Sequence, residues 1–357
     1  MKNKHGANIF EISRVYGFDI EDIVDFSSNI NPLGPSETAK QYLIDHMELI
    51  SSYPDTDYIN LKKEIADYIN LDMDDLLLFN GTTEGLINYI KLINPMNSLI
   101  LSPCYSEYEN ELNKISSKIF YYNLLEENNF EIDLDKLISI INRFNIELFI
   151  FANPNNPTGT ILDKDQIEKL LTNTRCKILI DETYIEFTDQ EKFSASSLCK
   201  KYENLIVLRG LSKFFAMPGI RLGYSINSSK NLKDLISNKQ MLWNINILAA
   251  ILAEKSFADK EYRKSVFDFI SEQRQEIFSR LDKIKDIKYY KSYGNFILCK
   301  ILNDKKAKDL RDYLLTKAMV IRDCSNFNNL DEKYFRFCIL NAKENKKLLD
   351  HIEEYFN

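Results

Sequence analysis

The sequence predicts an α/β protein in which a large domain is followed by a smaller α+β domain. Up to Lys213, short apolar runs typical of buried strands alternate with helical patterns. Several of these runs end in loops rich in Gly, Pro and Asn. Beyond that point charged helical stretches are mixed with further strands, and 357 residues are enough for two such units.

Each expected element follows from the spacing of apolar residues. The expected strands of the large domain are Leu76–Phe79, Ser98–Pro103, Lys118–Leu124, Glu147–Ala152, Cys176–Asp181 and Leu205–Leu208. The expected helices include patterns that run through residues 9–15, 86–89, 134–141 and 167–171. The apolar stretch Gln240–Phe257 predicts one long buried helix that links the two domains, and a charged helix over 261–284 and a strand over 295–300 are expected in the small domain.

Composition excludes several classes of protein. The chain is 45% hydrophobic and 28% charged, and the net charge of −7 leaves no basic field for nucleic acid. It has no apolar run long enough for a membrane span and no signal-like start, which favours a cytoplasmic protein. Six unpaired cysteines indicate free thiols, and three distant histidines give no metal motif.

The segment Arg209–Tyr224 has the residues of a reactive site. Lys213 lies between Ser212 and two phenylalanines, where partial burial would lower its pKa and free the amine as a nucleophile. Arg221 presents a planar group suited to a phosphate. The alternative for a single Lys and Arg is an ordinary surface position.

Two loops after strands add polar groups. A glycine turn, Asn80–Gly85, precedes a helix, so free main-chain N–H groups can hold an anion there. The proline-rich segment Asn153–Gly159 is expected to form a fixed loop after the strand Glu147–Ala152. Asp181 ends a buried strand, where burial of its charge is costly unless the carboxylate has a partner. A protonated ring nitrogen is a suitable partner. The alternative is that Asp181 caps a helix, which is common for Asp after a strand.

These motifs resemble those of the fold-type I pyridoxal-phosphate (PLP) enzymes of the aminotransferase class I/II family. The match runs through Gly210, Leu211, Ser212, Lys213, Ala216, Met217, Gly219 and Arg221–Gly223. The resemblance implies the PLP-dependent transferase fold, with a central, mostly parallel seven-stranded sheet flanked by helices. It also implies an N-terminal segment over 1–30, a large PLP-binding domain over 31–250 and a small domain over 251–357.

The resemblance assigns cofactor roles residue by residue. Lys213 is the residue that holds PLP covalently and moves protons. Asp181 pairs with the ring nitrogen, Asn156 and Tyr184 bind the phenolic oxygen, and Tyr105 covers the ring. The phosphate ligands are Gly81, Thr82, Thr83, Ser212, Arg221 and, from the partner subunit of a homodimer, Tyr53. Gly210 departs from relatives that carry a second hydroxyl there.

Substrate roles follow from the wording of the N-terminal loop, DFSSNINPLGPS, which resembles the threonine-phosphate decarboxylases. His5, Asn8, Asn29 and Arg322 are expected near the substrate phosphate, although loop and edge-strand residues of these types also serve as turn caps or face solvent. Arg336 matches the residue that binds the α-carboxylate. Leu340 stands where a further arginine is expected.

The expected activity is decarboxylation of L-threonine O-3-phosphate to (R)-1-amino-2-propanol O-2-phosphate for cobalamin biosynthesis. The alternative is histidinol-phosphate aminotransferase, the sister branch. A PLP-binding protein without catalysis is a third reading, against which the presence of Lys213, Asp181 and Asn156 argues.

Overall fold

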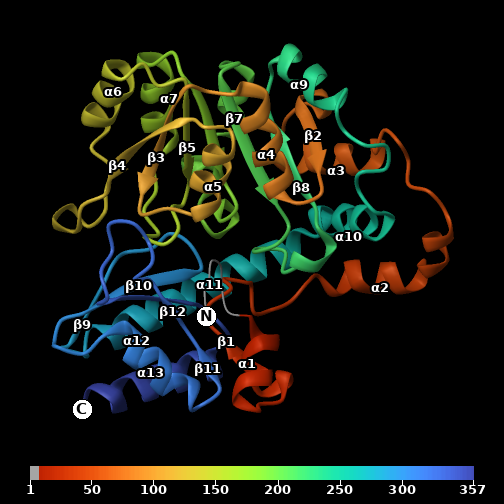
Figure 1. The fold of residues 1–357 in the computed structure, drawn as a ribbon. Coiled ribbons are helices and arrows are strands. Elements are labelled where there is room, and N and C mark those ends of the chain that lie inside the picture. Colours follow the sequence, from red (N-terminus) through yellow and green to blue (C-terminus); the bar gives the residue numbers. More distant parts are fainter. Residues whose placement is uncertain (1–7) are drawn as a thin grey trace.

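A seven-stranded sheet forms the centre of the larger part of the molecule (Figure 1). The computed structural model describes residues 8–357. Neighbouring strands among β3–β7 are parallel, whereas β8 is antiparallel to both of its neighbours. In spatial order the strands are β2 (Leu76–Phe79), β8 (Gly223–Ile226), β7 (Leu205–Gly210), β6 (Lys177–Asp181), β5 (Leu148–Ala152), β3 (Asn97–Ser102) and β4 (Lys118–Asn123). The predicted, mostly parallel sheet is confirmed.

Helices cover both faces of this sheet. Along β5, Phe149 and Phe151 belong to one hydrophobic core, whereas Leu148 and Ile150 belong to the other. This alternation follows from the two-residue period of a strand and makes β5 a continuous apolar run. The first core includes residues of α3 (Ile59–Ile69), α6 (Leu134–Arg143) and α7 (Lys164–Asn173), and the second includes residues of α4 (Thr82–Ile93), α5 (Ser106–Lys114) and α9 (Lys230–Ser237).

A second, antiparallel sheet of four strands lies below the first in Figure 1. Consecutive side chains of β10 and β13 are buried in its core, to which α12 (Ala307–Leu315) and α13 (Ala342–Phe356) also contribute. The strands in spatial order are β12 (Arg322–Asp323), β13 (Tyr334–Cys338), β10 (Phe296–Ile301) and β9 (Ile287–Tyr289).

The N-terminal segment lies against this second unit. After α1 (Ile9–Tyr16), strand β1 (Val24–Asp25) pairs in parallel with β11 (Met319–Val320). The main-chain oxygen of Phe26 accepts a hydrogen bond from the Cys338 N–H at 2.8 Å. The segment therefore delivers residues 27–29 to the space between the sheets. The domain boundaries at residues 30 and 250 stay a prediction, since strand pairing does not define them.

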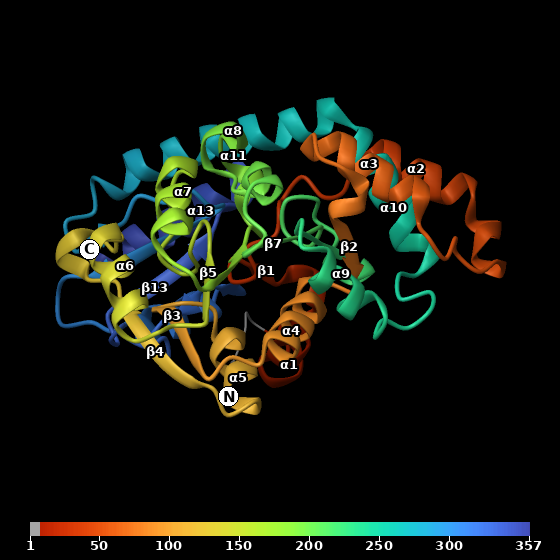
Figure 2. The same cartoon turned by 90° about the horizontal axis from the view of Figure 1, so that it is seen from above.

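The predicted long helix over Gln240–Phe257 is wrong in its length, and its role as a link between domains stays a prediction. Helix α10 spans Ile247–Ala258 and packs on α2 (Glu37–Asp45) and α3. The Asn246 side chain caps it by accepting a hydrogen bond from the Ala249 N–H at 2.9 Å, which satisfies a free donor of the first turn. The 22-residue helix α11 (Lys260–Leu281) lies between the upper and lower parts of the molecule in Figure 1 and runs along the upper edge of Figure 2. It contacts residues 185–187, which follow β6, as well as β9 and α13.

Glu126, just after β4, connects the large sheet to the small sheet through hydrogen bonds. Its carboxylate accepts hydrogen bonds from Tyr290 Oη at 2.7 Å and from Tyr334 Oη at 2.8 Å. Lys300 Nζ and Lys288 Nζ donate to it at 2.5 and 3.3 Å. All four donors belong to the second unit, at or beside strands β9, β10 and β13, so one carboxylate fixes the placement of that sheet.

Candidate active site

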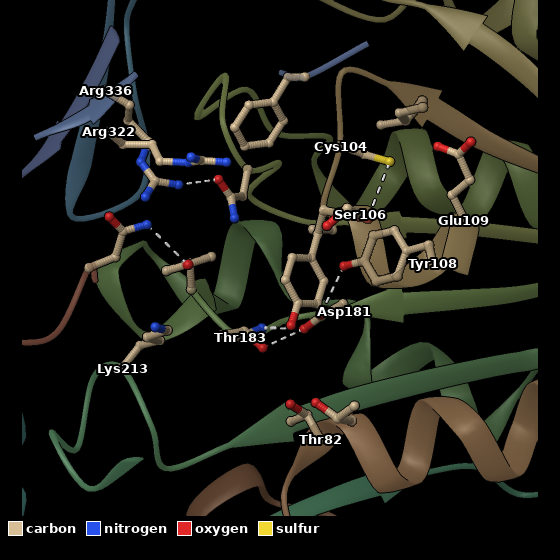
Figure 3. Close-up of a pocket in the computed structure, with 18 of the residues that line it drawn as sticks. Thr82, Cys104, Ser106, Tyr108, Glu109, Asp181, Thr183, Lys213, Arg322 and Arg336 are labelled. Atoms are coloured by element: carbon tan, nitrogen blue, oxygen red, sulfur yellow. Dashed lines mark hydrogen bonds between the residues drawn. The ribbon is translucent and has the colours of Figure 1, made fainter. Parts of the chain in front are cut away.

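A cavity of about 430 Å³ lies where the two sheets face each other (Figure 3). Parallel strands end at the same edge of a sheet, and ligands bind outside their carboxyl ends. The predicted site residues that line this cavity are Asn29, Thr82, Thr83, Tyr105, Asn156, Asp181, Tyr184, Ser212, Lys213, Arg221, Arg322 and Arg336. The chain thus brings together residues that are up to three hundred positions apart, such as Asn29 and Arg336.

The predicted phosphate ligands surround the first turn of α4. Gly81 has φ +83°, and a Cβ atom there would lie 2.2 Å from Arg221 Nη2, so only glycine lets the guanidinium approach this turn. Thr82 and Thr83 follow at the helix N-terminus, where unpaired N–H groups face outward. Together with the Ser212 hydroxyl, these donors form a cup that fits a phosphate.

Gly210 departs from the family pattern for a steric reason. A Cβ at Gly210 would lie 2.7 Å from Thr82 Cγ2, and one at Gly223 would lie 2.5 Å from the Thr82 main-chain nitrogen. Strands β7 and β8 can therefore pass directly beneath Thr82 because each has a glycine at that point, Gly210 and Gly223. In this chain the space that a hydroxyl at position 210 would need is filled by the Thr82 methyl group.

Lys213 lies in the loop after β7 and points into the cavity (Figure 3). Its Nζ donates a hydrogen bond to the Ser28 main-chain oxygen at 2.6 Å. Burial, reinforced by the nearby charge of Arg336, lowers the pKa of Lys213 to about 8. A substantial fraction of the amine is therefore neutral near pH 8, the state that a nucleophile requires.

Asp181 is partly buried at the end of β6, where it lines the cavity. Its Oδ1 accepts hydrogen bonds from the Thr183 N–H at 3.0 Å and the Thr183 hydroxyl at 2.5 Å, and its Oδ2 accepts one from Tyr108 Oη at 2.8 Å. Burial raises the pKa of Asp181, and the hydrogen bonds and the charge of Lys213 oppose that rise. A buried carboxylate at this place fits a protonated ring nitrogen.

Tyr184 and Asn156 lie on the side of the cavity nearest the small sheet. Asn29 Nδ2 donates to Tyr184 Oη at 3.1 Å, and Arg336 Nη1 donates to Asn156 Oδ1. Both groups that are predicted to bind a phenolic oxygen are thus in contact with residues predicted to bind substrate. Burial raises the pKa of Tyr184, so its hydroxyl keeps its proton and can donate it.

Arg322 and Arg336 supply the positive charge of the cavity wall that the small sheet forms. Arg336 Nη2 donates to the Ser27 main-chain oxygen at 2.7 Å, and its Nε, which is buried, has no hydrogen-bond partner. Arg322 Nη2 donates to Asn326 Oδ1 at 2.8 Å, and its guanidinium lies 5.2 Å from the centre of the Phe327 ring. Within residues 8–357, the ion pairs include neither arginine.

Other predicted residues lie away from this cavity. Tyr53 is 78% exposed and stacks on Trp243 with 4.3 Å between ring centres. Asn8 caps α1 by accepting a hydrogen bond from the Glu11 N–H at 3.2 Å, and is not part of the cavity wall. His5 lies outside the described residues. Leu340 packs against the core of the chain and leaves Arg322 and Arg336 as the arginines of this wall.

The sequence did not identify a further group of cavity residues. Tyr108 and Thr183 contact Asp181. On the wall opposite the arginines, Glu109 accepts hydrogen bonds from Tyr121 Oη at 2.9 Å and from Asn328 Nδ2 at 3.1 Å. The aromatic spacing of Tyr105 and Tyr108, three residues apart in a first helical turn, was the signal available for one of them.

The fold and the cavity define a PLP-dependent enzyme of fold type I. Residues 21–352 match the family described as aminotransferase class I and II, and the chain belongs to this family. The donors around α4, the buried Asp181 and the accessible Lys213 amine fit its cofactor, pyridoxal 5′-phosphate. No helix in residues 8–357 is long and apolar enough to cross a membrane.

Named relatives divide between two activities. The threonine-phosphate decarboxylase of Salmonella typhimurium is 30% identical over 97% of this chain and 94% of its own length. The bifunctional protein CobDQ of adenosylcobalamin biosynthesis from Leptospira interrogans is 32% identical, and the match covers 99% of this chain but 41% of that protein. The crystal structure of the histidinol-phosphate aminotransferase from Clostridium acetobutylicum is 34% identical, with a TM-score of 0.88 over 94% of this chain and 99% of that one.

Proposed function

We propose that this protein decarboxylates L-threonine O-3-phosphate to (R)-1-amino-2-propanol O-2-phosphate, as a step in cobalamin biosynthesis. The observation that carries the proposal is the pair of buried arginines on one cavity wall, which are 8% and 4% exposed for Arg322 and Arg336. Buried cations without a counter-charge are costly, and a substrate with a phosphate and a carboxylate supplies two anions. The threonine-phosphate decarboxylase relative supports this substrate, and the CobDQ relative supports the pathway.

In this proposal the residues divide the work. Arg336 binds the α-carboxylate, and Arg322 binds the phosphate, each through charge-assisted hydrogen bonds. PLP, when bound, accepts the electrons that are released at Cα. Lys213, with a pKa of about 8, returns a proton to Cα after CO2 has left. Asn29 and Tyr184 are hydrogen-bonded to each other and form part of the cavity wall that orients the substrate.

A second candidate is histidinol-phosphate aminotransferase, favoured by the 34% identity to the Clostridium acetobutylicum enzyme. Its usual amino donor, glutamate, would also present two anions to Arg322 and Arg336. The two reactions differ in the bond that is broken at Cα and in the need for a 2-oxo acid.

The deciding experiment incubates the holoenzyme with phosphothreonine and measures CO2 release with and without 2-oxoglutarate. The decarboxylase releases CO2 in both cases and forms 1-amino-2-propanol phosphate. Efficient transamination of histidinol phosphate, together with no CO2 from phosphothreonine, would refute the first proposal and support the second. The PLP assignment is independent of this outcome.

We also propose that the active protein is a homodimer with shared sites. Tyr53 is exposed and is not among the residues that line the cavity, and large apolar side chains are exposed nearby in sequence, including Ile50 at 59%. Met241 and Leu242, which precede the Trp243 that stacks on Tyr53, are 81% and 73% exposed. A second copy of the chain would cover this surface and receive Tyr53 at its phosphate cup.

A further inference from the structure

Tyr108 is a buried residue of α5 that contacts the cofactor wall through its hydroxyl and through its ring. Its side chain is 0% exposed, and its hydroxyl donates to Asp181 Oδ2 at 2.8 Å. Its ring packs edge-on against Tyr105, with 5.5 Å between ring centres and an interplanar angle of 82°. Figure 3 shows the Tyr108 hydroxyl directed at Asp181 from the side of the cavity opposite Lys213.

Thr183 approaches the other oxygen of the same carboxylate. It provides two donors, its main-chain N–H and its hydroxyl, both to Asp181 Oδ1. The N–H group can only donate, so Asp181 Oδ1 is the acceptor in this contact. Asp181 therefore receives three hydrogen bonds from two residues while it is partly buried in the cavity wall.

These contacts act on the charge state of Asp181. An isolated buried carboxylic acid favours its neutral form, whereas hydrogen bonds donated to it favour the carboxylate. Such bonds to charged groups are stronger than those between neutral groups. Three donors thus oppose the effect of burial at the place where the ring nitrogen of the cofactor is expected.

We propose that Tyr108 and Thr183 are positioning residues that keep Asp181 ionised, so that the proton shared between Asp181 and the cofactor ring is held on the ring nitrogen. The proton has two possible locations, the carboxylate oxygen or the nitrogen, and donors to the carboxylate favour the second. The inference rests on the predicted contact of Asp181 with that nitrogen. It does not depend on whether the substrate is decarboxylated or transaminated.

The same residue also links two parts of the cofactor wall. Tyr105 is predicted to lie on the ring face, and Tyr108 supports it edge-on while it holds Asp181. A change that removes only the Tyr108 oxygen separates these two roles, because the aromatic packing is kept. Tyr108→Phe is therefore the informative variant.

The test loads the apoprotein with PLP that carries ¹⁵N in the pyridine ring and records the nitrogen chemical shift by NMR. We expect a pyridinium signal in the wild-type holoenzyme. In Tyr108→Phe and in Thr183→Val the signal should move towards that of a neutral pyridine. We also expect the apparent Kd for PLP to rise roughly tenfold in Tyr108→Phe, the size of one lost hydrogen bond to a charged group.

Tyr89→Phe is the matched control. Tyr89 is equally buried, on α4, and its hydroxyl lies 2.8 Å from Ser225 Oγ, so its loss removes one buried hydroxyl without touching Asp181. Its ¹⁵N signal should equal that of the wild type. Circular dichroism and thermal unfolding of each apoprotein check that the variants are folded, and Thr183→Val provides the measurement if Tyr108→Phe does not bind PLP.

Two results would overturn the inference, and they are distinguishable. If Asp181→Asn moves the nitrogen signal but Tyr108→Phe and Thr183→Val leave it at the wild-type position, the two residues do not control the proton. If Asp181→Asn also leaves the signal unchanged, the predicted contact between Asp181 and the ring nitrogen is wrong, and the inference falls with it. Neither result bears on the identity of the substrate.

Discussion

Arg322 and Arg336 stand directly opposite each other in the antiparallel pair of β12 and β13. Opposed residues in such a pair project on the same face, with Cβ atoms about 4.5–5.5 Å apart. Burial lowers the pKa of Arg322, and the charge of Arg336 contributes to that decrease. Like charges so placed are unfavourable by themselves, which makes this wall a receptor for anions.

The first prediction separates the two arginines by substrate. Arg336→Ala and Arg322→Ala should each cost on the order of 2–5 kcal/mol in transition-state binding, since either leaves a desolvated anion unpaired. Loss of Arg336 should lower turnover for every α-amino acid tested, whereas loss of Arg322 should mainly penalise phosphorylated ones. Steady-state kinetics with phosphothreonine and threonine measure the difference. Arg311→Ala, at an arginine paired with Asp312, is the control, and equal losses for both substrates in Arg322→Ala would contradict the assignment.

The second prediction concerns Lys213. The purified holoenzyme should be yellow, and borohydride reduction should fix the cofactor on Lys213, as a peptide map would show. Because only the neutral amine reacts, the rate of PLP capture by the apoprotein should rise with pH and level off above about 8. Arg336→Gln removes a neighbouring cation, so the midpoint of that curve should move to higher pH. A label on another lysine would disprove the assignment.

The third prediction tests the phosphate cup. In Gly81→Ala the new methyl group must displace Arg221 and adopt a left-handed backbone, so PLP affinity should fall by tenfold or more, on the order of 1.4 kcal/mol per tenfold. Gly17→Ala is a matched control, because Gly17 has φ +75° with no atom within 4 Å of the added Cβ. It carries the same backbone strain, about 1–2 kcal/mol, without the collision. Equal PLP affinity in both variants would count against the cup.

The fourth prediction tests the shared site. Lys213→Ala and Tyr53→Ala homodimers should each have little activity. In a mixed dimer both defects fall in one site and the other site is intact, so activity should reappear after subunit exchange. Exchange is verified with differently tagged subunits. Failure to recover activity in verified mixed dimers would argue that each site is complete within one chain.

The fifth prediction concerns the attachment of the small sheet. Partial burial raises the pKa of Glu126, but hydrogen bonds from Lys300, Tyr290 and Tyr334 outweigh this effect and lower that pKa to about 2. An unfolded Glu titrates near pH 4.3, so this stabilisation is complete above about pH 4.3 and is lost as pH falls towards 2.

Glu126→Gln should therefore reduce the free energy of unfolding by about 1.5–3 kcal/mol at pH 7, with a smaller difference at pH 3. Urea unfolding at both pH values gives the comparison. Glu332→Gln removes an exposed partner of Lys306 and should change stability little. A Glu126→Gln difference that is the same at pH 3 as at pH 7 would show that the charge of Glu126 is not responsible.

Much of the fold and most of the cavity could be predicted from the sequence, because both depend on local patterns. Buried strands are short apolar runs, and Lys213 and Arg221 lie in one continuous motif. The contact of Tyr108 with Asp181 could not be predicted in this way, since it joins residues 73 positions apart. Glu126 and its small-sheet donors are more distant still, and nothing in the neighbouring residues marks their pairing.

The prediction of a helix over residues 240–257 was wrong for a different reason. Apolar residues continue without interruption through Met241, Leu242 and Trp243, which suggests burial. The structure gives Trp243 a left-handed backbone, with φ 53°, and begins the helix only after the Asn246 cap. An apolar run thus reflects the proposed contact with a second chain as well as the core of the first, and periodicity does not distinguish the two.

The cavity takes its residues from two separate sheets. Lys213, Asp181 and the turn before α4 belong to the large sheet, whereas Arg322 and Arg336 belong to the small one. Substitutions at Arg322 in β12 can change which molecule enters without touching the groups that hold the cofactor, whereas Arg336 in β13 also contacts Asn156 and lowers the pKa of Lys213. A gene lineage can therefore move from one metabolic role to another through ancestors that all remain able to load PLP.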